Sequence, residues 1–147
     1  MNTVNEMKLQ FISKSTNESF ARSAVSAFVL PLDPTISELA DIKTAVSEAV
    51  TNCIVHAYPD TLGIIYIDAK ITDSNKVIIK IKDKGVGIEN IEKALEPLYT
   101  TSNGERAGLG FAVMQSFMDN VKVRSTMNKG TSVTLEKSII KVNYDKR

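Results

Sequence analysis

The chain has 147 residues, 43% hydrophobic and 24% charged, which predicts one globular domain rather than a disordered segment. Its net charge is only +1, which argues against direct binding to bulk nucleic acid or to an anionic membrane. No N-terminal apolar run is long enough for a signal peptide or a membrane-spanning helix, so we expect a cytoplasmic protein.

The N-terminal half predicts one strand followed by two helices. Apolar and polar residues alternate over 7–13, which is typical of a strand. A capping-box pattern at 15–18 (STNE) predicts the start of a helix that runs to about Leu30. A second capping box at 35–38 (TISE) starts a longer helix, whose apolar pattern continues to about Ala57.

The C-terminal half predicts two hairpins with two short helices and an aperiodic loop between them. The predicted elements are a strand at 63–72, a turn at 73–75, a strand at 76–82, a helix at about 88–95, a loop at 97–107, a helix at 109–119, and strands at 121–127 and 131–136.

This order of elements, β-α-α-β-β-α-loop-α-β-β, predicts the α+β fold class. Its hairpins imply a two-layer α/β sandwich, with a mixed or antiparallel sheet and helices on one face. The order differs from the strict strand-helix alternation of a doubly wound fold. We expect residues 1–137 to form this domain and 138–147 to form a frayed polar C-terminal tail.

The long predicted helix carries a polar stripe. Glu48 and Asn52 are four residues apart and share one face, with His56 one turn further. A solvated helix edge explains this stripe equally well when it is taken alone. The functional interpretation is a magnesium and phosphate site, because Mg²⁺ prefers oxygen ligands and keeps substrate phosphates in its shell. Asn52 would then hold the metal, and Glu48 would orient or deprotonate a nucleophile.

The single cysteine and the single histidine lie in the same helical segment. Cys53 is interpreted as a small core residue rather than a reactive thiol, and His56 as a packed or capping residue rather than a ligand. One cysteine and one histidine exclude an internal disulfide and a zinc-type cluster.

A second motif, DKGVG at 83–87, follows the predicted strand at 76–82. The Asp83 carboxylate can accept a hydrogen bond from the amino group of adenine, whereas the carbonyl of guanine would leave it unpaired. Gly85 and Gly87 would let the backbone turn and approach the ring without a Cβ clash. The motif alone is weak evidence, because glycine turns after strands are common.

A third motif, GLG at 108–110, lies where the loop meets a helix. Backbone N–H groups at a helix start bind phosphate, and Arg106 is placed to pair with a terminal phosphate. The alternative is a flexible loop that ends in a helix cap. Thr131, by its residue type and position, is interpreted as a strand residue rather than a ligand. No Walker-type motif occurs, so the commoner nucleotide-binding folds are unsupported.

Together the three motifs resemble the ATP-binding domain of the GHKL superfamily, which gyrase, heat-shock chaperones, mismatch-repair ATPases and histidine kinases share. Four segments indicate a particular family within this superfamily: NESFAR at 17–22, SEAVTN at 47–52, PLYTT at 97–101 and GLGF at 108–111. Over roughly 7–136 the chain resembles the anti-sigma-F factors of spore-forming bacteria. Cys53 departs from the pattern, because many superfamily members carry alanine there.

The resemblance implies a GHKL (Bergerat) fold and a dimeric, ATP- and Mg²⁺-dependent protein serine/threonine kinase. Such a protein also sequesters a sporulation sigma factor of the sigma-F type and phosphorylates its anti-anti-sigma factor on serine. The implied catalytic residues are Glu48 and Arg106, with Asn52 as the metal ligand. The implied partner-binding residues are Glu18 and Arg22, which from spacing alone are merely an i,i+4 ion pair. The implied cofactor-binding residues are Asn52, Asp83, Gly85, Gly87, Thr100, Thr101, Gly108, Leu109, Gly110 and Thr131.

Two other interpretations stay open at this point. One is a nucleotide-gated, sigma-binding module without kinase activity, and the other is a general-stress anti-sigma kinase of the same family. The catalytic domain of a histidine kinase is disfavoured, because no helical hairpin precedes the domain and His56 falls inside the expected site.

Overall fold

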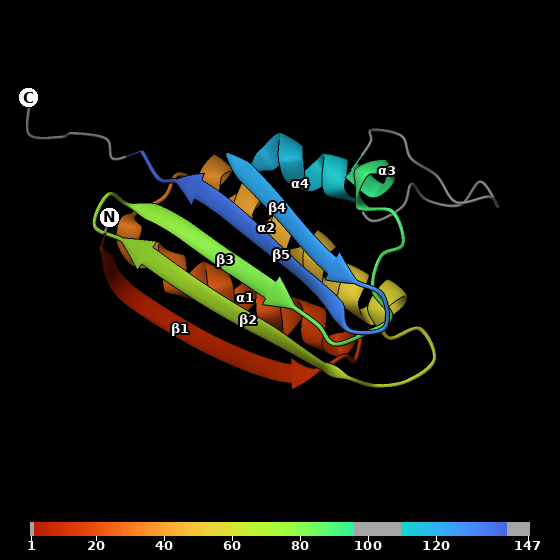
Figure 1. Cartoon of the computed structure of the whole chain (residues 1–147). Coiled ribbons are helices and arrows are strands. Elements are labelled where there is room, and N and C mark those ends of the chain that lie inside the picture. The colour runs from red at the N-terminus through yellow and green to blue at the C-terminus, as the bar shows by residue number, and fades with distance from the viewer. Residues whose placement is uncertain (1, 96–109, 141–147) are drawn as a thin grey trace, which may run out of the picture.

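The structure, a computed structural model, describes residues 2–95 and 110–140, which form a sheet with helices on one of its faces (Figure 1). The elements are β1 Thr3–Ile12, α1 Thr16–Val29, the 3₁₀ turn η1 Leu30–Leu32, α2 Ile36–Asn52, the π-helical turn η2 Cys53–Ala57, β2 Ile64–Thr72, β3 Lys76–Lys82, α3 Ile91–Leu95, α4 Phe111–Phe117, β4 Asn120–Thr126 and β5 Gly130–Ser138. The predicted order of strands and helices is confirmed.

The sheet has the strand order β1-β2-β3-β5-β4, and each neighbouring pair is antiparallel. The predicted α+β fold class and the two layers are therefore confirmed, but the described sheet is antiparallel rather than mixed. The reason is that β2–β3 and β4–β5 are hairpins, and β3 pairs with β5 in the antiparallel sense. This order places β5 beside β3, although they are far apart in sequence.

The core lies between the sheet and the helices α1 and α2. Alternate residues of β2 and β3 point into it, so that Ile67 lies opposite Ile81 and Ala69 opposite Ile79, all buried. Side chains alternate between the two faces of a strand, so each of these strands has one apolar face. A shift of the pairing by one residue would turn this face away from the core, and the burial of the apolar face therefore fixes the register. Helices α1 and α2 supply the facing layer with Val25, Val29, Ile42, Val46 and Val50.

One predicted capping box forms and the other does not. Thr35 has extended backbone angles, its hydroxyl accepts a hydrogen bond from the Glu38 N–H (3.0 Å), and the Glu38 carboxylate accepts one from the Thr35 N–H (2.9 Å). Ser15 instead has helical backbone angles and makes no side-chain cap. An N-cap needs an extended conformation to bring its oxygen to the first free N–H groups, so the prediction at 15–18 was wrong.

The long helix extends to Ala57 as predicted, but its last turn is π-helical. The Tyr58 N–H donates to the Cys53 carbonyl at 3.1 Å, which is an i→i+5 hydrogen bond. Helix α3 begins at Ile91 rather than 88, because Asn90 accepts a hydrogen bond from the Lys93 N–H in the manner of an N-cap (2.9 Å). Helix α4 begins at Phe111, and Leu109 of the predicted helix lies outside the described residues.

The packed part of the domain extends beyond residue 137, toward the C-terminus. Strand β5 continues through Ser138, and Ile139 is buried, with its N–H donating to the Asn75 carbonyl (3.0 Å). The boundary at 137 stays a prediction, and residues 141–147 lie outside the described part. Across 2–95 and 110–140, no helix is long and apolar enough to cross a membrane.

The two caps make a matched test of local helix stability. We expect Thr35→Ala to lower the free energy of unfolding by about 1 kcal/mol, because it removes a formed cap, and Ser15→Ala to lower it by no more than about 0.3 kcal/mol. Urea unfolding monitored by circular dichroism would measure both. Equal losses in the two variants would contradict the difference between the caps.

Candidate functional site

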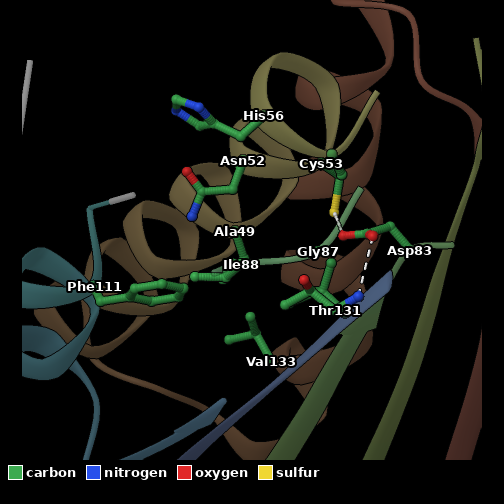
Figure 2. A pocket seen from close by; sticks show the side chains of 12 residues that line it. Ala49, Asn52, Cys53, His56, Asp83, Gly87, Ile88, Phe111, Thr131 and Val133 are labelled. Carbon is green, nitrogen blue, oxygen red and sulfur yellow. Dashed lines mark hydrogen bonds between the residues drawn. The ribbon is translucent and has the colours of Figure 1, made fainter. Parts of the chain in front are cut away.

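A pocket lies between the end of α2, the end of β3, strand β5 and the start of α4 (Figure 2). It brings together four of the predicted cofactor-binding residues, Asn52, Asp83, Gly87 and Thr131. Its lining residues are Ala49, Asn52, Cys53, His56, Ala57, Ile81, Asp83, Gly87, Ile88, Phe111, Thr131 and Val133. The pocket thus combines an apolar lining with a few polar groups, as small-molecule sites do.

Asp83 is the anchor of this pocket. The residue is 5% exposed, and its Oδ1 accepts hydrogen bonds from the N–H groups of Gly85 (2.9 Å) and Thr131 (3.1 Å). Its Oδ2 accepts one from the Cys53 thiol (3.5 Å). Burying a carboxylate is costly unless donors surround it, and here a loop, a strand and a helix end each contribute one. The acceptor atoms therefore have a fixed position in the pocket wall.

Gly85 and Gly87 are required by contacts inside the protein. A Cβ on Gly85 would collide with the Ala57 carbonyl, which accepts a hydrogen bond from the Val86 N–H (3.0 Å). Gly87 has φ +83°, and a Cβ there would lie 2.6 Å from the Thr126 carbonyl oxygen. Only Gly87 lines the pocket, so the predicted approach of backbone to a ring applies to that glycine.

The turn between β4 and β5 holds the glycine loop in place. The Asn128 N–H donates to the Val86 carbonyl (2.8 Å), and the Ile88 N–H donates to Ser125 Oγ (2.8 Å). Ser125 Oγ also lies 2.8 Å from Thr131 Oγ1. A Cβ on Gly130 would collide with the Asp83 carbonyl. Sequence reasoning found this turn but missed its contact with 83–88, since only the adjacency of β3 and β5 reveals it.

The end of α2 forms the opposite wall. Asn52 is 9% exposed, and Figure 2 shows its amide directed into the pocket, with His56 above it at the rim. Cys53 is buried, as predicted, but it lines the pocket and its thiol faces Asp83. Burial, together with the charge of Asp83, raises the pKa of the Cys53 thiol well above its usual range, so the group stays protonated.

Glu48 lies one turn before Asn52 on α2 but faces a different depression. It lines a groove between α1 and α2, and the other lining residues are Arg22, Ser23, Ala40, Lys43, Thr44 and Ser47. Arg22 Nε lies 3.7 Å from Glu18 Oε2, so the predicted i,i+4 ion pair forms beside this groove. The structure therefore places Glu48 with the predicted partner-binding residues, and Asn52 with the predicted nucleotide-binding residues.

The loop residues of the predicted site lie outside the described part of the chain. They are Thr100, Thr101, Arg106, Gly108 and Leu109. Gly110 is described: it has φ +65° and precedes α4. Phe111 follows it and is a buried part of the pocket lining, and the partly buried Ile88 also lines the pocket. Sequence reasoning assigned no pocket role to either, and the only signal was their position next to the glycine motifs.

Comparisons with known proteins agree with this fold. Residues 14–137 match the family described as histidine kinase-like ATPase domain. The chain is 61% identical to the anti-sigma F factor of Caldanaerobacter subterraneus subsp. tengcongensis over 92% of this chain and 94% of that protein. It is 58% identical to the anti-sigma F factor of a Geobacillus species, over 93% and 94% of the two chains. For that of Clostridium acetobutylicum the identity is 54%, over 90% and 93%.

Solved structures show the same fold at low sequence identity. The chain is similar to the crystal structure of the RsbU and RsbW domains of Rv1364c from Mycobacterium tuberculosis, with a TM-score of 0.70 and 17% identity. The match covers 95% of this chain but only 34% of that chain. A blue-light activated histidine kinase of Erythrobacter litoralis matches with a TM-score of 0.59 and 17% identity, over 80% of this chain and 40% of that chain.

The contact between Gly85 and the π-helical turn can be tested directly. We expect Gly85→Ala to lower the free energy of unfolding by about 1–3 kcal/mol, because the added methyl has no room against the Ala57 carbonyl. The matched control is Val86→Ala at the exposed neighbouring position, where the change should stay within about 0.5 kcal/mol. Chemical denaturation without any ligand would measure both, and a stable Gly85→Ala protein would contradict the close approach.

Proposed function

Because the chain belongs to the anti-sigma F factor family, within the histidine kinase-like ATPase domains, we propose that it is an ATP- and Mg²⁺-dependent protein serine kinase that sequesters a sigma factor. The sigma factor would be of the sporulation sigma-F type. The phosphorylated substrate would be its anti-anti-sigma factor, modified on serine. The observation that carries this proposal is the buried, donor-held Asp83 carboxylate in one pocket with the Asn52 amide.

The polar and apolar groups of the pocket match the chemistry of an adenine ring. A carboxylate accepts hydrogen bonds but donates none, so Asp83 favours the amino group of adenine over the carbonyl of guanine. Ile88, Phe111 and Val133 supply apolar surface around it. The selectivity follows from burial, because a buried carboxylate that faces a carbonyl loses its hydrogen bond to water without gaining another.

The Asn52 amide fits a magnesium ion only together with phosphate groups. Within 2–95 and 110–140, no three His, Cys, Asp or Glu side chains lie close enough to hold a metal ion. Magnesium commonly takes one or two protein ligands and completes its octahedral shell with water and phosphate oxygens, which matches a single amide. Bound Mg-ATP would supply the phosphoryl group that is transferred. Asn52 would orient it by holding the metal, as expected from the helix pattern.

Glu48 would act on the acceptor serine. It lies on the same helix as Asn52, one turn earlier, in the groove between α1 and α2. A carboxylate there can hold the serine hydroxyl and accept its proton as the phosphoryl group is transferred. Arg106, expected to pair with the terminal phosphate, lies outside the described residues, as do Thr100, Thr101, Gly108 and Leu109.

The groove between α1 and α2 also supports a partner surface. Glu18 and Arg22 form their ion pair beside it, and Arg22 and Lys43 give it positive charge next to Glu48. We therefore propose that the sigma factor and the anti-anti-sigma factor bind over this groove. The two partners would then compete for one surface that neighbours the nucleotide pocket.

The specific alternative is a nucleotide-gated, sigma-binding module without kinase activity. It is favoured by the separation of Glu48 from the pocket that holds Asn52 and Asp83. In that case the bound nucleotide would stabilise the fold and determine which partner binds, but it would donate no phosphoryl group. The kinase assay below separates the two functions.

The kinase proposal is tested with purified protein, Mg²⁺, ATP labelled on its terminal phosphate, and a candidate anti-anti-sigma factor from the same organism. We expect label on a partner serine. Glu48→Gln should lower the labelling rate by about 10²–10⁴-fold while ATP and sigma binding persist, because only the proton acceptor is lost. Asn52→Ala should abolish both Mg²⁺-dependent ATP binding and labelling.

Each result has a distinct meaning. ATP binding without label transfer in the unmodified protein would support the nucleotide-gated module. A Glu48→Gln protein that labels at the normal rate would remove Glu48 from the reaction. No ATP binding at all would mean that 83–87 is an ordinary glycine turn, and the proposal would be wrong.

We also propose that the protein is a homodimer that uses strand β1. In the described sheet β1 is an edge strand and pairs only with β2, and its Val4 and Ile12 are exposed. Unpaired strand edges favour association with another strand. Light scattering should give twice the chain mass, and Val4→Lys should shift the protein toward monomer. A concentration-independent monomer mass would reject the dimer.

A further inference from the structure

The two oxygens of the Asp83 carboxylate are held from opposite walls of the pocket. Oδ1 accepts from the N–H groups of Gly85 and Thr131, which belong to the loop after β3 and to β5. Oδ2 accepts from Cys53 Sγ at 3.5 Å, and Cys53 follows Asn52 at the end of α2 (Figure 2). The thiol is therefore the contact that joins the helix wall to the carboxylate.

The contact with the thiol has a different effect on the carboxylate from that of the two backbone contacts. The backbone N–H groups fix one oxygen, but a carboxylate held at one oxygen can still rotate its plane about that position. A donor on the second oxygen restricts this rotation and leaves the other acceptor site of Oδ2 for a ligand. Since Asp83 is 5% exposed and lines the pocket, the orientation of its plane decides what the pocket can recognise.

We propose that Cys53 is a positioning residue for purine recognition, whose thiol orients the Asp83 carboxylate toward the 6-amino group of an adenine nucleotide. The inference rests on the proposed ATP-binding function and adds a specificity role that an alanine at this position would not provide. Cys53 itself donates to Asp83 and need not touch the nucleotide. The competing explanation is that Cys53 only fills space in the core, where it is 4% exposed.

The first test compares adenosine diphosphate with inosine diphosphate, which carries a carbonyl in place of the 6-amino group. We expect Cys53→Ala to lower the ratio of the two affinities by about 2–10-fold, the effect of one hydrogen bond of ordinary strength. Cys53→Ser should keep the ratio close to that of the unmodified protein, because a hydroxyl is also a donor. Isothermal titration calorimetry of the full chain measures both affinities.

The matched control is Val50→Ala. Val50 is fully buried on the same helix and is not among the residues that line the pocket, so the change makes a cavity outside the pocket lining. It should lower thermal stability and leave the affinity ratio unchanged. A ratio that is unchanged in Cys53→Ala, or that falls equally in Val50→Ala, would overturn the positioning role.

A second measurement needs no nucleotide. The chain has one cysteine, so the infrared S–H stretching band reports Cys53 alone. We expect this band to move to higher frequency in Asp83→Asn, because a neutral amide oxygen is a weaker acceptor than a carboxylate. A band at the same frequency would show that the thiol does not donate to Asp83 and would overturn the inference. Failure of the unmodified protein to bind either nucleotide would instead overturn the proposed function.

Discussion

The site depends on one constraint, that a carboxylate buried at the end of β3 must have hydrogen-bond donors on every side. Asp83 satisfies it with groups from three elements: the glycine loop, strand β5 and the end of α2. Each of these elements must therefore bring a donor to the Asp83 carboxylate. This requirement is met by the turn at Gly85, by the position of β5 beside β3 and by the last turn of the long helix. Together these three features form the pocket walls.

The sheet order makes this meeting possible. Strand β5 comes from the C-terminal hairpin but pairs with β3, so Thr131 lies beside Asp83 and the turn at Gly130 packs on its backbone. The π-helical turn completes the arrangement, because the Ala57 carbonyl in that turn accepts from the Val86 N–H. π-helical turns often occur at functional sites. Here this turn joins the helix end to the glycine loop, and its Ala57 lines the pocket.

The features that could be predicted from the sequence are those that depend on local residue patterns. Periodicity gave the order of the strands and helices, and the residue pattern at Thr35 gave its cap. Ser15 has the same pattern but helical backbone angles, and nothing local distinguishes the two. Spacing also placed Glu48 and Asn52 on one helix face, and in the structure Asn52 lines the pocket whereas Glu48 lines the groove between α1 and α2. The contact of Cys53 with Asp83 was missed because it exists only once β3 and α2 are side by side.

The separation of Glu48 from Asn52 has a consequence for regulation. One helix, α2, forms a wall of the proposed nucleotide pocket and a wall of the proposed partner groove, so the two proposed sites share this helix. If nucleotide binding shifts this helix end, partner affinity changes, and linkage requires the partner to change nucleotide affinity by the same factor. The π-helical turn lies at the end of this helix, and its Ala57 lines the pocket. A partner bound in the groove and a nucleotide bound at Asp83 would each favour one position of α2. If both favour the same position, each raises the affinity for the other, and if they favour different positions, each lowers it.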